Sequence, residues 1–317
     1  MSADLSANSL FRVDGMVAVI TGGGSGIGLI MARALAANGA KRVYLLGRRA
    51  DVLAKAAKEH PGIFDAIICD VTSKDSLTEV VAKITGDIGY VNLVIANAGA
   101  LGSKKRWDTQ NGKTPISKLK DELFDSNDMS QMDEAFSINA TGAFFSMVAF
   151  LELLDEGNKR AVKAGAAKNG DAKGEVVFGW PIKEGGKTPS IQSQIIVTSS
   201  ISAFSRMGAS SPAYLGSKAA ITQLAKQACT ALAPYGIRVN TLAPGIFPSD
   251  LASGIMANRD PESEGPENPA WIPAQRFGTD EDMAGTILYL ASRAGAFCNG
   301  SVQVMDGGRL GVGQSSY

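Results

Sequence analysis

The 317-residue chain has few of the residues on which several catalytic schemes depend. It has one histidine, His60, which precedes Pro61 in an expected loop, so a Ser-His-Asp hydrolase or a dehydrogenase with a histidine base would have to be built around that residue alone. Its three cysteines, Cys69, Cys229 and Cys298, are far apart and form no CxxC pair, which argues against a disulfide framework. No metal-ligand spacing is present, and we expect no metal.

Charge and hydropathy narrow the class further. Lysine plus arginine and aspartate plus glutamate each number 31, so the net charge of zero gives no indication of binding to nucleic acid or to an anionic membrane. No apolar run is long enough to span a bilayer, and the N-terminal "MSADLSANSLFRVDG" has no apolar signal core. These features predict a soluble, cytoplasmic protein that binds a small molecule.

Short apolar runs alternate with helix-like segments along the whole chain. Strands are expected at 16–20, 42–47, 65–69, 91–96, 193–199, 236–242 and 301–305. Helices are expected from the glycine-rich stretch to about Asn38, from about Ala50, and at 73–85, 129–154, 212–233 and 280–292. Because the strands are apolar without alternation, the pattern predicts an α/β fold whose parallel sheet is covered on both faces by helices. With no repeat or boundary visible, residues 1–317 are expected to form one domain.

Two connections are much longer than the usual 4–6 residues or so. The first, at about 100–128, follows the fourth strand, and the second, at about 156–192, precedes the fifth. Ligands bind such sheets at the carboxyl ends of the strands, which is where the first insertion begins. Only the first insertion is therefore well placed to touch a substrate. The second is rich in Gly, Lys and Ala and is expected to be a solvated segment at the opposite edge.

A glycine-rich stretch gives the first chemical signal. The segment "VITGGGSGIG" (19–28) lies between an expected strand and an expected helix. Gly22, Gly26 and Gly28 allow a tight turn and a close approach of the backbone to a pyrophosphate, which the helix N-terminus attracts through its free N–H groups and dipole. The spacing is not G-x-G-x-x-G. The context nevertheless predicts a nucleotide-binding loop.

The end of the second strand indicates which nucleotide is bound. A carboxylate there would bond the ribose 2′-hydroxyl of NAD, whereas an arginine would bind the 2′-phosphate of NADP. This strand ends Gly47–Arg48–Arg49 with no carboxylate. We therefore expect NADP (NADPH) with Arg48 on its phosphate; the alternative is a pair of solvated arginines.

Six motifs occur in a fixed order: "TGGGSGIG" (21–28), "NAG" (97–99), Asn139 in "SINATGAFF", "TSSIS" (198–202), "YLGSK" (214–218) and "APG" (243–245). The ordered set resembles the short-chain dehydrogenase/reductase family over nearly the whole chain outside the two insertions. The resemblance implies a Rossmann-type, doubly wound domain with a seven-stranded parallel sheet, a nicotinamide cofactor, and assembly into a homodimer or homotetramer. It also implies a catalytic set of Asn139, Ser200, Tyr214 and Lys218.

The spacing of Tyr214 and Lys218 gives this pair a physical rationale. Residues four apart lie on one face of a helix, and the face that begins with these two continues with apolar residues. A cation about 5 Å from a phenol, at an effective dielectric constant of about 20, is worth roughly 3 kcal/mol, or about 2 pKa units. Lys218, helped by an oxidised nicotinamide, is therefore predicted to lower the pKa of Tyr214 so that it exchanges protons near neutrality. The alternative is a packed tyrosine beside a lysine that only reaches solvent.

The other two members of the set leave alternatives open. Ser200 would bond the substrate oxygen, but it lies fourteen positions before Tyr214, one more than is usual in the family. Ser199 and Ser202 therefore remain alternatives. The resemblance implies that Asn139 holds a water in a proton relay to the lysine. The alternative is a structural amide that bridges backbone groups in mid-helix.

The resemblance also implies which residues contact the cofactor. They come from the loop, from the ends of the third, fourth and sixth strands, and from the catalytic helix: Gly22, Gly24, Ser25, Gly26, Ile27, Gly28, Asp70, Val71, Asn97, Ala98, Gly99, Tyr214, Lys218, Pro244, Gly245 and Ile246. Ser249 stands where the family often has a threonine for the nicotinamide carboxamide.

The segment 246–278 leaves the carboxyl edge of the sheet and is expected to form a lid over the substrate. Its apolar residues, and a tryptophan from the first insertion, are expected to line the site: Phe247, Leu251, Ile255, Met256, Trp271 and Trp107. The alternative is that they only pack the lid onto the domain. No arginine pair or basic cluster marks an anionic sugar or phosphate substrate, so the predicted substrate is a fairly large, mostly apolar ketone or alcohol of the kind found in secondary metabolism, such as a polyketide-like, terpenoid or steroid-like molecule.

These features predict an NADP(H)-dependent carbonyl reductase or alcohol dehydrogenase. The alternative is a protein of the same fold that binds the cofactor but has a non-redox role in epimerisation, cyclisation or scaffolding.

Overall fold

A parallel sheet forms the centre of the computed structural model, which describes residues 4–109, 112–166, 176–179, 186–207 and 210–316. All neighbouring strands are parallel, and their order is β3-β2-β1-β4-β5-β6-β7. The strands are β1 (Val17–Thr21), β2 (Arg42–Gly47), β3 (Phe64–Ile68), β4 (Leu93–Ala96), β5 (Gln194–Thr198), β6 (Arg238–Pro244) and β7 (Val302–Met305). The predicted seven-stranded, doubly wound fold is confirmed, and each strand lies within two residues of its predicted bounds.

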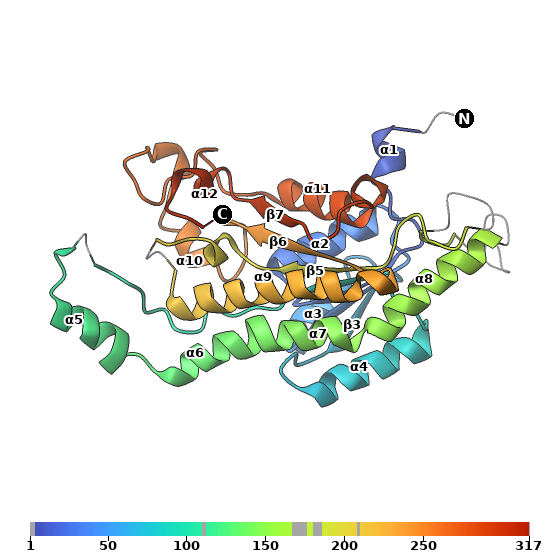
Figure 1. Cartoon of the computed structure of the whole chain (residues 1–317), viewed down its shortest axis with the longest axis horizontal. Coiled ribbons are helices and arrows are strands. Elements are labelled where there is room, and N and C mark those ends of the chain that lie inside the picture. The colour runs from blue at the N-terminus through green and yellow to red at the C-terminus, as the bar shows by residue number, and fades with distance from the viewer. Residues whose placement is uncertain (1–3, 110–111, 167–175, 180–185, 208–209, 317) are drawn as a thin grey trace.

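Helices cover both faces of the sheet (Figure 1). The longer α-helices are α2 (Gly26–Ala37), α3 (Ala50–Ala57), α4 (Lys74–Asp87), α6 (Met129–Phe136), α7 (Ala143–Ala149), α8 (Leu151–Ala166), α9 (Pro212–Leu232) and α11 (Asp280–Ala291). Short α-helices are α1 (Ala7–Leu10), α5 (Ile116–Lys120), α10 (Ser253–Met256) and α12 (Arg309–Val312). The segments η2 (Asp121–Asp125) and η3 (Ser137–Gly142) are π-helical, whereas η4 (Ile201–Ala203), η5 (Ala233–Tyr235), η6 (Pro261–Ser263) and η7 (Arg293–Gly295) are 3₁₀ turns.

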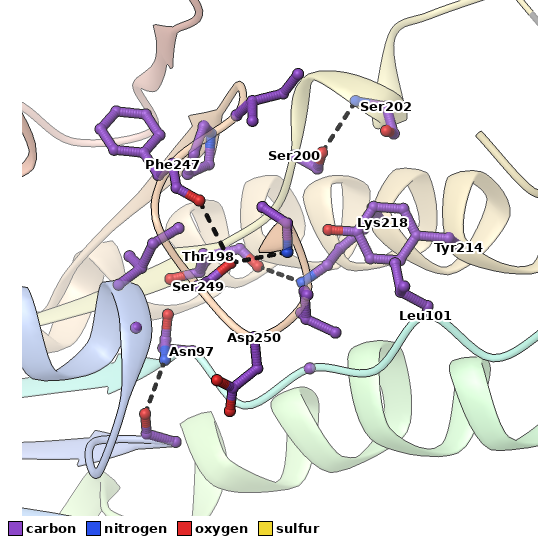
Figure 2. A pocket seen from close by; sticks show the side chains of 18 of the residues that line it. Asn97, Leu101, Thr198, Ser200, Ser202, Tyr214, Lys218, Phe247, Ser249 and Asp250 are labelled. Carbon is purple, nitrogen blue, oxygen red and sulfur yellow. Dashed lines mark hydrogen bonds between the residues drawn. The ribbon is translucent and has the colours of Figure 1, made fainter. Parts of the chain in front are cut away.

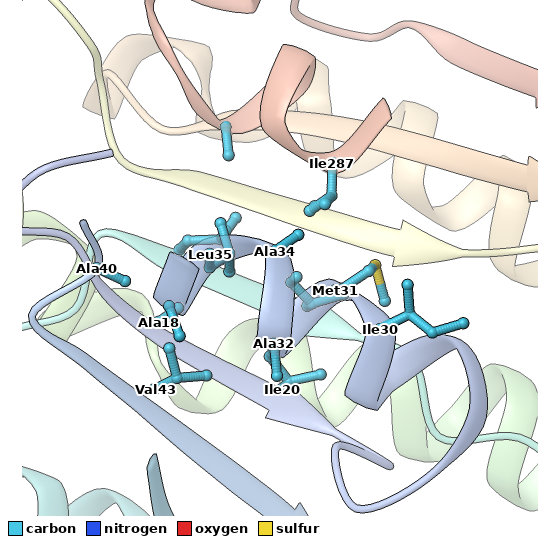
Figure 3. Close-up of a cluster of buried hydrophobic side chains, with 14 of the residues drawn as sticks. Ala18, Ile20, Ile30, Met31, Ala32, Ala34, Leu35, Ala40, Val43 and Ile287 are labelled. Carbon is cyan, nitrogen blue, oxygen red and sulfur yellow. The ribbon is translucent and has the colours of Figure 1, made fainter. Parts of the chain in front are cut away.

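The sheet separates two apolar cores because successive residues of each strand face opposite sides. Ala18 and Ile20 of β1 pack with α2 and with Ile287 of α11 on one face (Figure 3). Val17 and Val19 pack on the other face, with α4, α7 and α9. All five β1 residues are buried, which explains why the sequence shows a continuous apolar run rather than alternation.

The helix predicted over 129–154 is interrupted twice. The π-helical turn η3 separates α6 from α7, and a second break at Phe150 separates α7 from α8. The segments Met129–Ala149 and Leu151–Ala164 meet at 42°. Within the described residues no single helix is long and apolar enough to cross a membrane, although this bent pair meets the length and composition test together.

The second insertion differs from its prediction. Helix α8 runs on to Ala166, so the connection begins about ten residues later than expected. Its described parts are not solvated throughout, since Val177, Phe178 and Ile191 are buried and Phe178 joins the core on the α2 face. A Cβ at Gly15, in the turn before β1, would lie 2.5 Å from the Val176 carbonyl oxygen, which places this segment at the amino ends of the strands. Residues 167–175 and 180–185 of the predicted insertion lie outside the described part of the chain.

Candidate active site

One cavity of about 1130 Å³ runs along the carboxyl ends of the strands. Its walls come from the loop before α2, the ends of β2, β4, β5 and β6, the first turn of α9, and the segment after β6 (Figure 2). A pocket for a single small ligand usually occupies about 300–1,000 Å³. The cavity is therefore large enough to hold a cofactor and a second molecule side by side.

The glycine-rich loop has a backbone that only glycine adopts without strain at two positions. The φ angles are +65° at Gly22 and +51° at Gly26. A Cβ at Gly28 would lie 2.3 Å from the Gly22 carbonyl oxygen, so this glycine allows the loop to pack on the helix. Gly28 itself does not line the cavity.

The start of α2 has the features of an anion site. The helix has no acidic residue in its first turn, and the side chain of its N-cap, Ser25, does not bond the helix. Backbone N–H groups in a first helical turn have no partner within the helix, and they lie at the positive end of the helix dipole. The loop therefore fits the pyrophosphate of a dinucleotide.

The predicted cofactor contacts converge on this cavity. Apart from Gly28, every residue predicted to contact the cofactor lines it: Gly22, Gly24, Ser25, Gly26, Ile27, Arg48, Asp70, Val71, Asn97, Ala98, Gly99, Tyr214, Lys218, Pro244, Gly245, Ile246 and Ser249. Thr21 is the first residue of the glycine-rich motif, although it was not itself predicted to have a role. Its Oγ1 accepts hydrogen bonds from the backbone N–H groups of Asn97 (2.9 Å) and Ala98 (3.0 Å). It thereby joins the ends of β1 and β4 at the point where the strand order reverses.

The two arginines after β2 have different surroundings. Arg48 is exposed, lines the cavity and makes no hydrogen bond within the described residues, although its charge helps to lower the pKa of Asp70 after the hydrogen bonds from Thr72. Arg49 turns across the cavity rim, where it donates to Ser25 Oγ (3.0 Å) and pairs with Asp250 (3.1 Å). The pairing with Asp250 could not be predicted from local sequence, because the two residues are 201 positions apart.

Tyr214, Ser200 and Lys218 lie together where β5 meets α9. Ser200 lines the cavity with Tyr214 and lowers the pKa of its phenol, while its own Oγ accepts a hydrogen bond from the Ser202 N–H (3.1 Å). Lys218 Nζ lies 5.8 Å from the centroid of the Tyr214 ring and donates a 2.8 Å hydrogen bond to the Thr198 carbonyl oxygen (Figure 2). Ser211 accepts a hydrogen bond from the Tyr214 backbone as the N-cap of α9, which begins at Pro212 as predicted.

Burial dominates the acid–base properties of this group. It lowers the pKa of Lys218 to about 8. It raises the pKa of Tyr214, and Ser200 opposes that rise. For the protein chain alone this direction is opposite to the one predicted with an oxidised nicotinamide bound, because the four-residue spacing indicates a nearby lysine but not the cost of burying a phenolate. The ammonium group at Lys218 is instead directed to a carbonyl oxygen of β5.

The three candidate serines point in different directions. Ser199 Oγ is buried against α9, where it bonds the Lys218 carbonyl oxygen (3.1 Å) and Thr222 Oγ1 (2.6 Å). Ser202 Oγ lies 2.7 Å from Ser210 Oγ, in the following loop. The hydroxyls of Ser199 and Ser202 are thus bound elsewhere, and Ser200 is the one of the three that acts on the pKa of Tyr214, which favours Ser200 despite the extra residue in the spacing.

Asn139 lies behind the cavity and does not line it. Its Oδ1 accepts from the Ala100 N–H (2.9 Å), and its Nδ2 donates to the Ala100 carbonyl oxygen (2.8 Å) and to Ser217 Oγ (2.9 Å). The side chain therefore joins the loop after β4 to α9. This bridging of backbone groups is the structural role named as the alternative from the sequence. A Cβ at Gly99 would lie 3.1 Å from Asn139 Oδ1 and 3.5 Å from Lys218 Nζ, so the glycine leaves room for this arrangement.

Ser249 lines the cavity beside the loop but uses its hydroxyl locally. Its Oγ accepts a hydrogen bond from the Ala252 N–H (3.2 Å), and a Cβ at Gly26 would lie 3.0 Å from Ser249 Cβ. The segment after β6 therefore lies directly over the glycine-rich loop.

The lining of the substrate end corrects two expectations. Phe247, Leu251 and Ile255 line the cavity as predicted. Three other residues predicted to line it do not: Met256, Trp271 and Trp107. The sequence also showed no arginine pair, yet Arg259 and Arg309 both line this end and interact electrostatically. Fifty positions separate them, so only the fold brings them together.

Comparison with known proteins assigns the chain to a family. Residues 16–168 match the family model described as short chain dehydrogenase, and residues 182–309 match the model described as Enoyl-(Acyl carrier protein) reductase. The short-chain dehydrogenase/reductase SAT3 of Stachybotrys chartarum is 52% identical over 287 residues, which cover 90% of this chain and 100% of SAT3. The chain belongs to the short-chain dehydrogenase/reductase family.

Other members of the short-chain dehydrogenase/reductase family match over the full length. PhomF of Diaporthe leptostromiformis is 44% identical, with 100% of this chain and 99% of PhomF covered. Among solved structures, the RhlG/NADP active-site complex of Pseudomonas aeruginosa has a TM-score of 0.72 and 26% identity, covering 95% of this chain and 98% of that one. The chain is therefore a member of an oxidoreductase family whose fold binds a nicotinamide cofactor.

Proposed function

We propose that this protein is an NADP(H)-dependent oxidoreductase that reduces a ketone to a secondary alcohol, or catalyses the reverse reaction. The observation that carries the proposal is the Ser200–Tyr214–Lys218 group, which lies in the same cavity as the glycine-rich loop. A protein that only bound the cofactor would not need a buried lysine and a serine beside a phenol.

The side chains have distinct roles in this proposal. Bound NADPH supplies the hydride. Ser200 holds the carbonyl oxygen of the substrate next to the Tyr214 hydroxyl, which donates the proton as the oxygen becomes an alcohol. Lys218, fixed by the Thr198 carbonyl oxygen, favours the phenolate that remains. Asn139 is a positioning residue that holds Ala100 and α9 in register.

Several observations support NADP as the cofactor. The end of β2 has no carboxylate, and Arg48 is exposed on the cavity with no hydrogen bond among the described residues. An exposed, unpaired guanidinium fits a ribose 2′-phosphate. The solved structure of RhlG is itself an NADP complex.

The segment 246–278 is proposed as a lid on the substrate. Buried Phe247 and half-exposed Leu251 line the cavity from this segment, opposite the residues that follow Ser200. An apolar lid surface favours a fairly large, mostly apolar ketone.

Consumption of NADPH in the presence of a ketone panel tests the proposed function. The panel contains bulky bicyclic and steroid ketones together with small keto-sugars, and absorbance of the reduced nicotinamide is the measurement. We expect turnover with bulky ketones. Efficient turnover of the small sugars alone would overturn the substrate class, and cofactor binding without redox turnover on any ketone or alcohol would favour a non-redox role.

We also propose a homodimer or homotetramer, as the family commonly forms through the helices that here carry Asn139 and Lys218. Sedimentation at micromolar concentration tests this, and a monomer throughout would contradict it.

A further inference from the structure

The substrate end of the cavity is closed by the C-terminal segment. The Arg206 N–H donates to the Gln314 carbonyl oxygen (2.9 Å), and the Ser316 N–H donates to the Phe204 carbonyl oxygen (2.8 Å). Ser205 and Ser315 pair as an antiparallel bridge between them. The segment that carries α12 is therefore attached to the loop that begins at Ser200, and it forms one wall of the substrate space.

This wall is mostly apolar but contains one arginine. The apolar side chains that line the same end are Ile201, Met207, Phe247, Leu251, Ile255 and Leu310. Among them is Arg309, the first residue of α12, placed by a tight turn in which Gly307 and Gly308 both have positive φ angles (64° and 89°). A guanidinium group in an apolar wall is costly unless a partner satisfies it.

Arg309 has no such partner within the described residues. Its side chain makes no hydrogen bond there, and its nitrogens are not cut off from solvent as Arg238 Nε is. Burial lowers the pKa of Arg309, and the neighbouring charge of Arg259 lowers it further. Asp306 and Glu264 oppose these effects without reversing them, so the carboxylates nearby do not compensate the burial of this guanidinium.

The two carboxylates near Arg309 already have other hydrogen-bond or ion-pair partners. Asp306 accepts hydrogen bonds from the backbone N–H groups of Gly308 (2.9 Å) and Leu310 (2.7 Å). Glu264 pairs with Arg259, which also donates to the Ala270 carbonyl oxygen (2.7 Å). Arg259 is thus held by the lid, and Arg309 is the guanidinium whose donors remain available to a ligand.

The charges of the residues that line the whole cavity also favour an anionic ligand. Its lining contains seven basic residues and two acidic ones, in a chain whose net charge is zero. Arg48 and Arg49 lie beside the glycine-rich loop, so their charge belongs to the cofactor end. Arg309 lies at the other end, among the apolar residues.

We propose that Arg309 binds a carboxylate on the substrate, so that the molecule reduced is an apolar keto acid (or the matching hydroxy acid) rather than a neutral ketone. This inference rests on the proposed function. A planar guanidinium presents paired donors that match the two oxygens of a carboxylate, whereas the rest of this wall offers apolar surface to the carbon skeleton.

The proposal is tested by measuring the reduction of a homologous series of methyl-ketone acids and of their methyl esters by the full chain with NADPH. The compounds CH₃CO(CH₂)ₙCOOH, with n increased stepwise, differ from their esters mainly in charge. We expect the acid to be preferred over its ester by about tenfold or more in kcat/KM at a preferred chain length. In Arg309→Gln that preference should vanish through a higher KM for the acid, while the ester is reduced as before. Arg309→Lys should keep part of the preference for the acid, because the positive charge remains but the paired donors of the guanidinium are lost.

Two controls make the result specific. Arg293→Gln removes an arginine that bonds Ser9 outside the cavity and should leave the acid preference intact. Lys104→Gln removes another cation of the cavity lining. Loss of the preference in Lys104→Gln but not in Arg309→Gln would overturn the proposal, as would equal turnover of acids and esters by the unaltered protein.

Calorimetry separates this inference from the proposed function. Binding of the preferred saturated acid with no keto group, measured on the NADP-loaded protein, requires Arg309 but no catalysis. Tight binding that Arg309→Gln abolishes would support the subsite even if no ketone were reduced. Reduction of ketones with no effect of Arg309→Gln on either binding or KM would refute the subsite and leave the proposed function standing.

Discussion

Lys218 Nζ lies 5.8 Å from the centre of the Tyr214 ring, and its hydrogen bond goes to the Thr198 carbonyl oxygen (2.8 Å) rather than to the phenol. The lysine is 3% exposed, so its charge is held inside the protein by a single carbonyl partner among the described residues. This arrangement has a measurable cost, because burial disfavours the ammonium form.

The stability of the protein should reflect that cost between pH 8 and pH 9. The pKa of Lys218 is about 8 in the folded protein and 10.5 ordinarily, so between these values the unfolded chain binds more protons than the folded one. Stability from this group therefore rises with pH through that window and is lowest below pH 8. Relative to Lys218→Met, the free energy of unfolding of the unaltered protein should increase by about 1 kcal/mol from pH 8 to pH 9. Denaturant titrations measure it; a constant difference, or one of opposite sign, would contradict the burial argument.

Cofactor preference should depend on Arg48 and not on Arg49. Arg48→Ala should weaken NADPH by about tenfold or more and leave NADH unchanged, because only NADPH carries the 2′-phosphate. Arg49→Ala is the matched control: it removes a residue tied to Ser25 and Asp250, and should affect both cofactors alike.

A carboxylate at Gly47 should reverse the preference. A Cβ there would lie 3.6 Å from Leu53 Cδ2, an ordinary contact, so Gly47→Asp fits the strand end. Combined with Arg48→Ala it should favour NADH through the ribose 2′-hydroxyl. Fluorescence titration of both cofactors is the measurement, and equal affinities in the unaltered protein would show that Arg48 is only solvated.

Alanine substitution of the three serines should separate their roles. Ser200→Ala should lower turnover by about 100-fold, since it removes the donor to the substrate oxygen. Ser199→Ala should cost about 1 kcal/mol of stability, because its hydroxyl bonds α9, with turnover largely retained. Ser202→Ala should change little, because among the described residues its hydroxyl bonds Ser210 alone. If Ser202→Ala or Ser199→Ala lowered turnover as much as Ser200→Ala, the assignment to Ser200 would be wrong.

Asn139→Ala should lower stability as well as turnover. It leaves both backbone groups of Ala100 without their partner, and we expect a loss of about 2–3 kcal/mol in the free energy of unfolding. Asn258→Ala, whose exposed amide makes one local bond to Gly254, is the control and should cost less than about 0.5 kcal/mol. Unchanged stability in Asn139→Ala with lost turnover would favour a role in proton relay alone.

Much of the fold could be predicted because its signals are local. The buried strands are short apolar runs, and α9 begins at Pro212 after a serine cap, so composition and period locate them. The π-helical turn η3 could not be predicted in this way. Its apolar row also fits an ordinary helix, and the contact of Asn139 with Ala100 is between residues 39 positions apart.

The features of the candidate site likewise fall into those that local sequence predicts and those that depend on contacts between distant residues. The motif residues that meet at the cavity were found because each motif carries its own chemistry. The direction of Arg49, the pKa of Tyr214 and the position of Arg309 depend on the fold. Arg49 pairs with Asp250, burial raises the pKa of Tyr214, and Arg309 lies within electrostatic reach of Arg259 from another segment. Short-range spacing predicts which groups are present, and packing decides what each one faces.

The central claim is that Tyr214 donates the proton in an NADPH-dependent ketone reduction. Single-turnover reduction of the best ketone in the panel, at saturating NADPH, tests it in Tyr214→Phe, which keeps the ring and removes only the hydroxyl. We predict that the rate falls by at least about 100-fold, while NADPH binds as in the unaltered protein. A rate close to that of the unaltered protein, with the cofactor bound, would contradict the account.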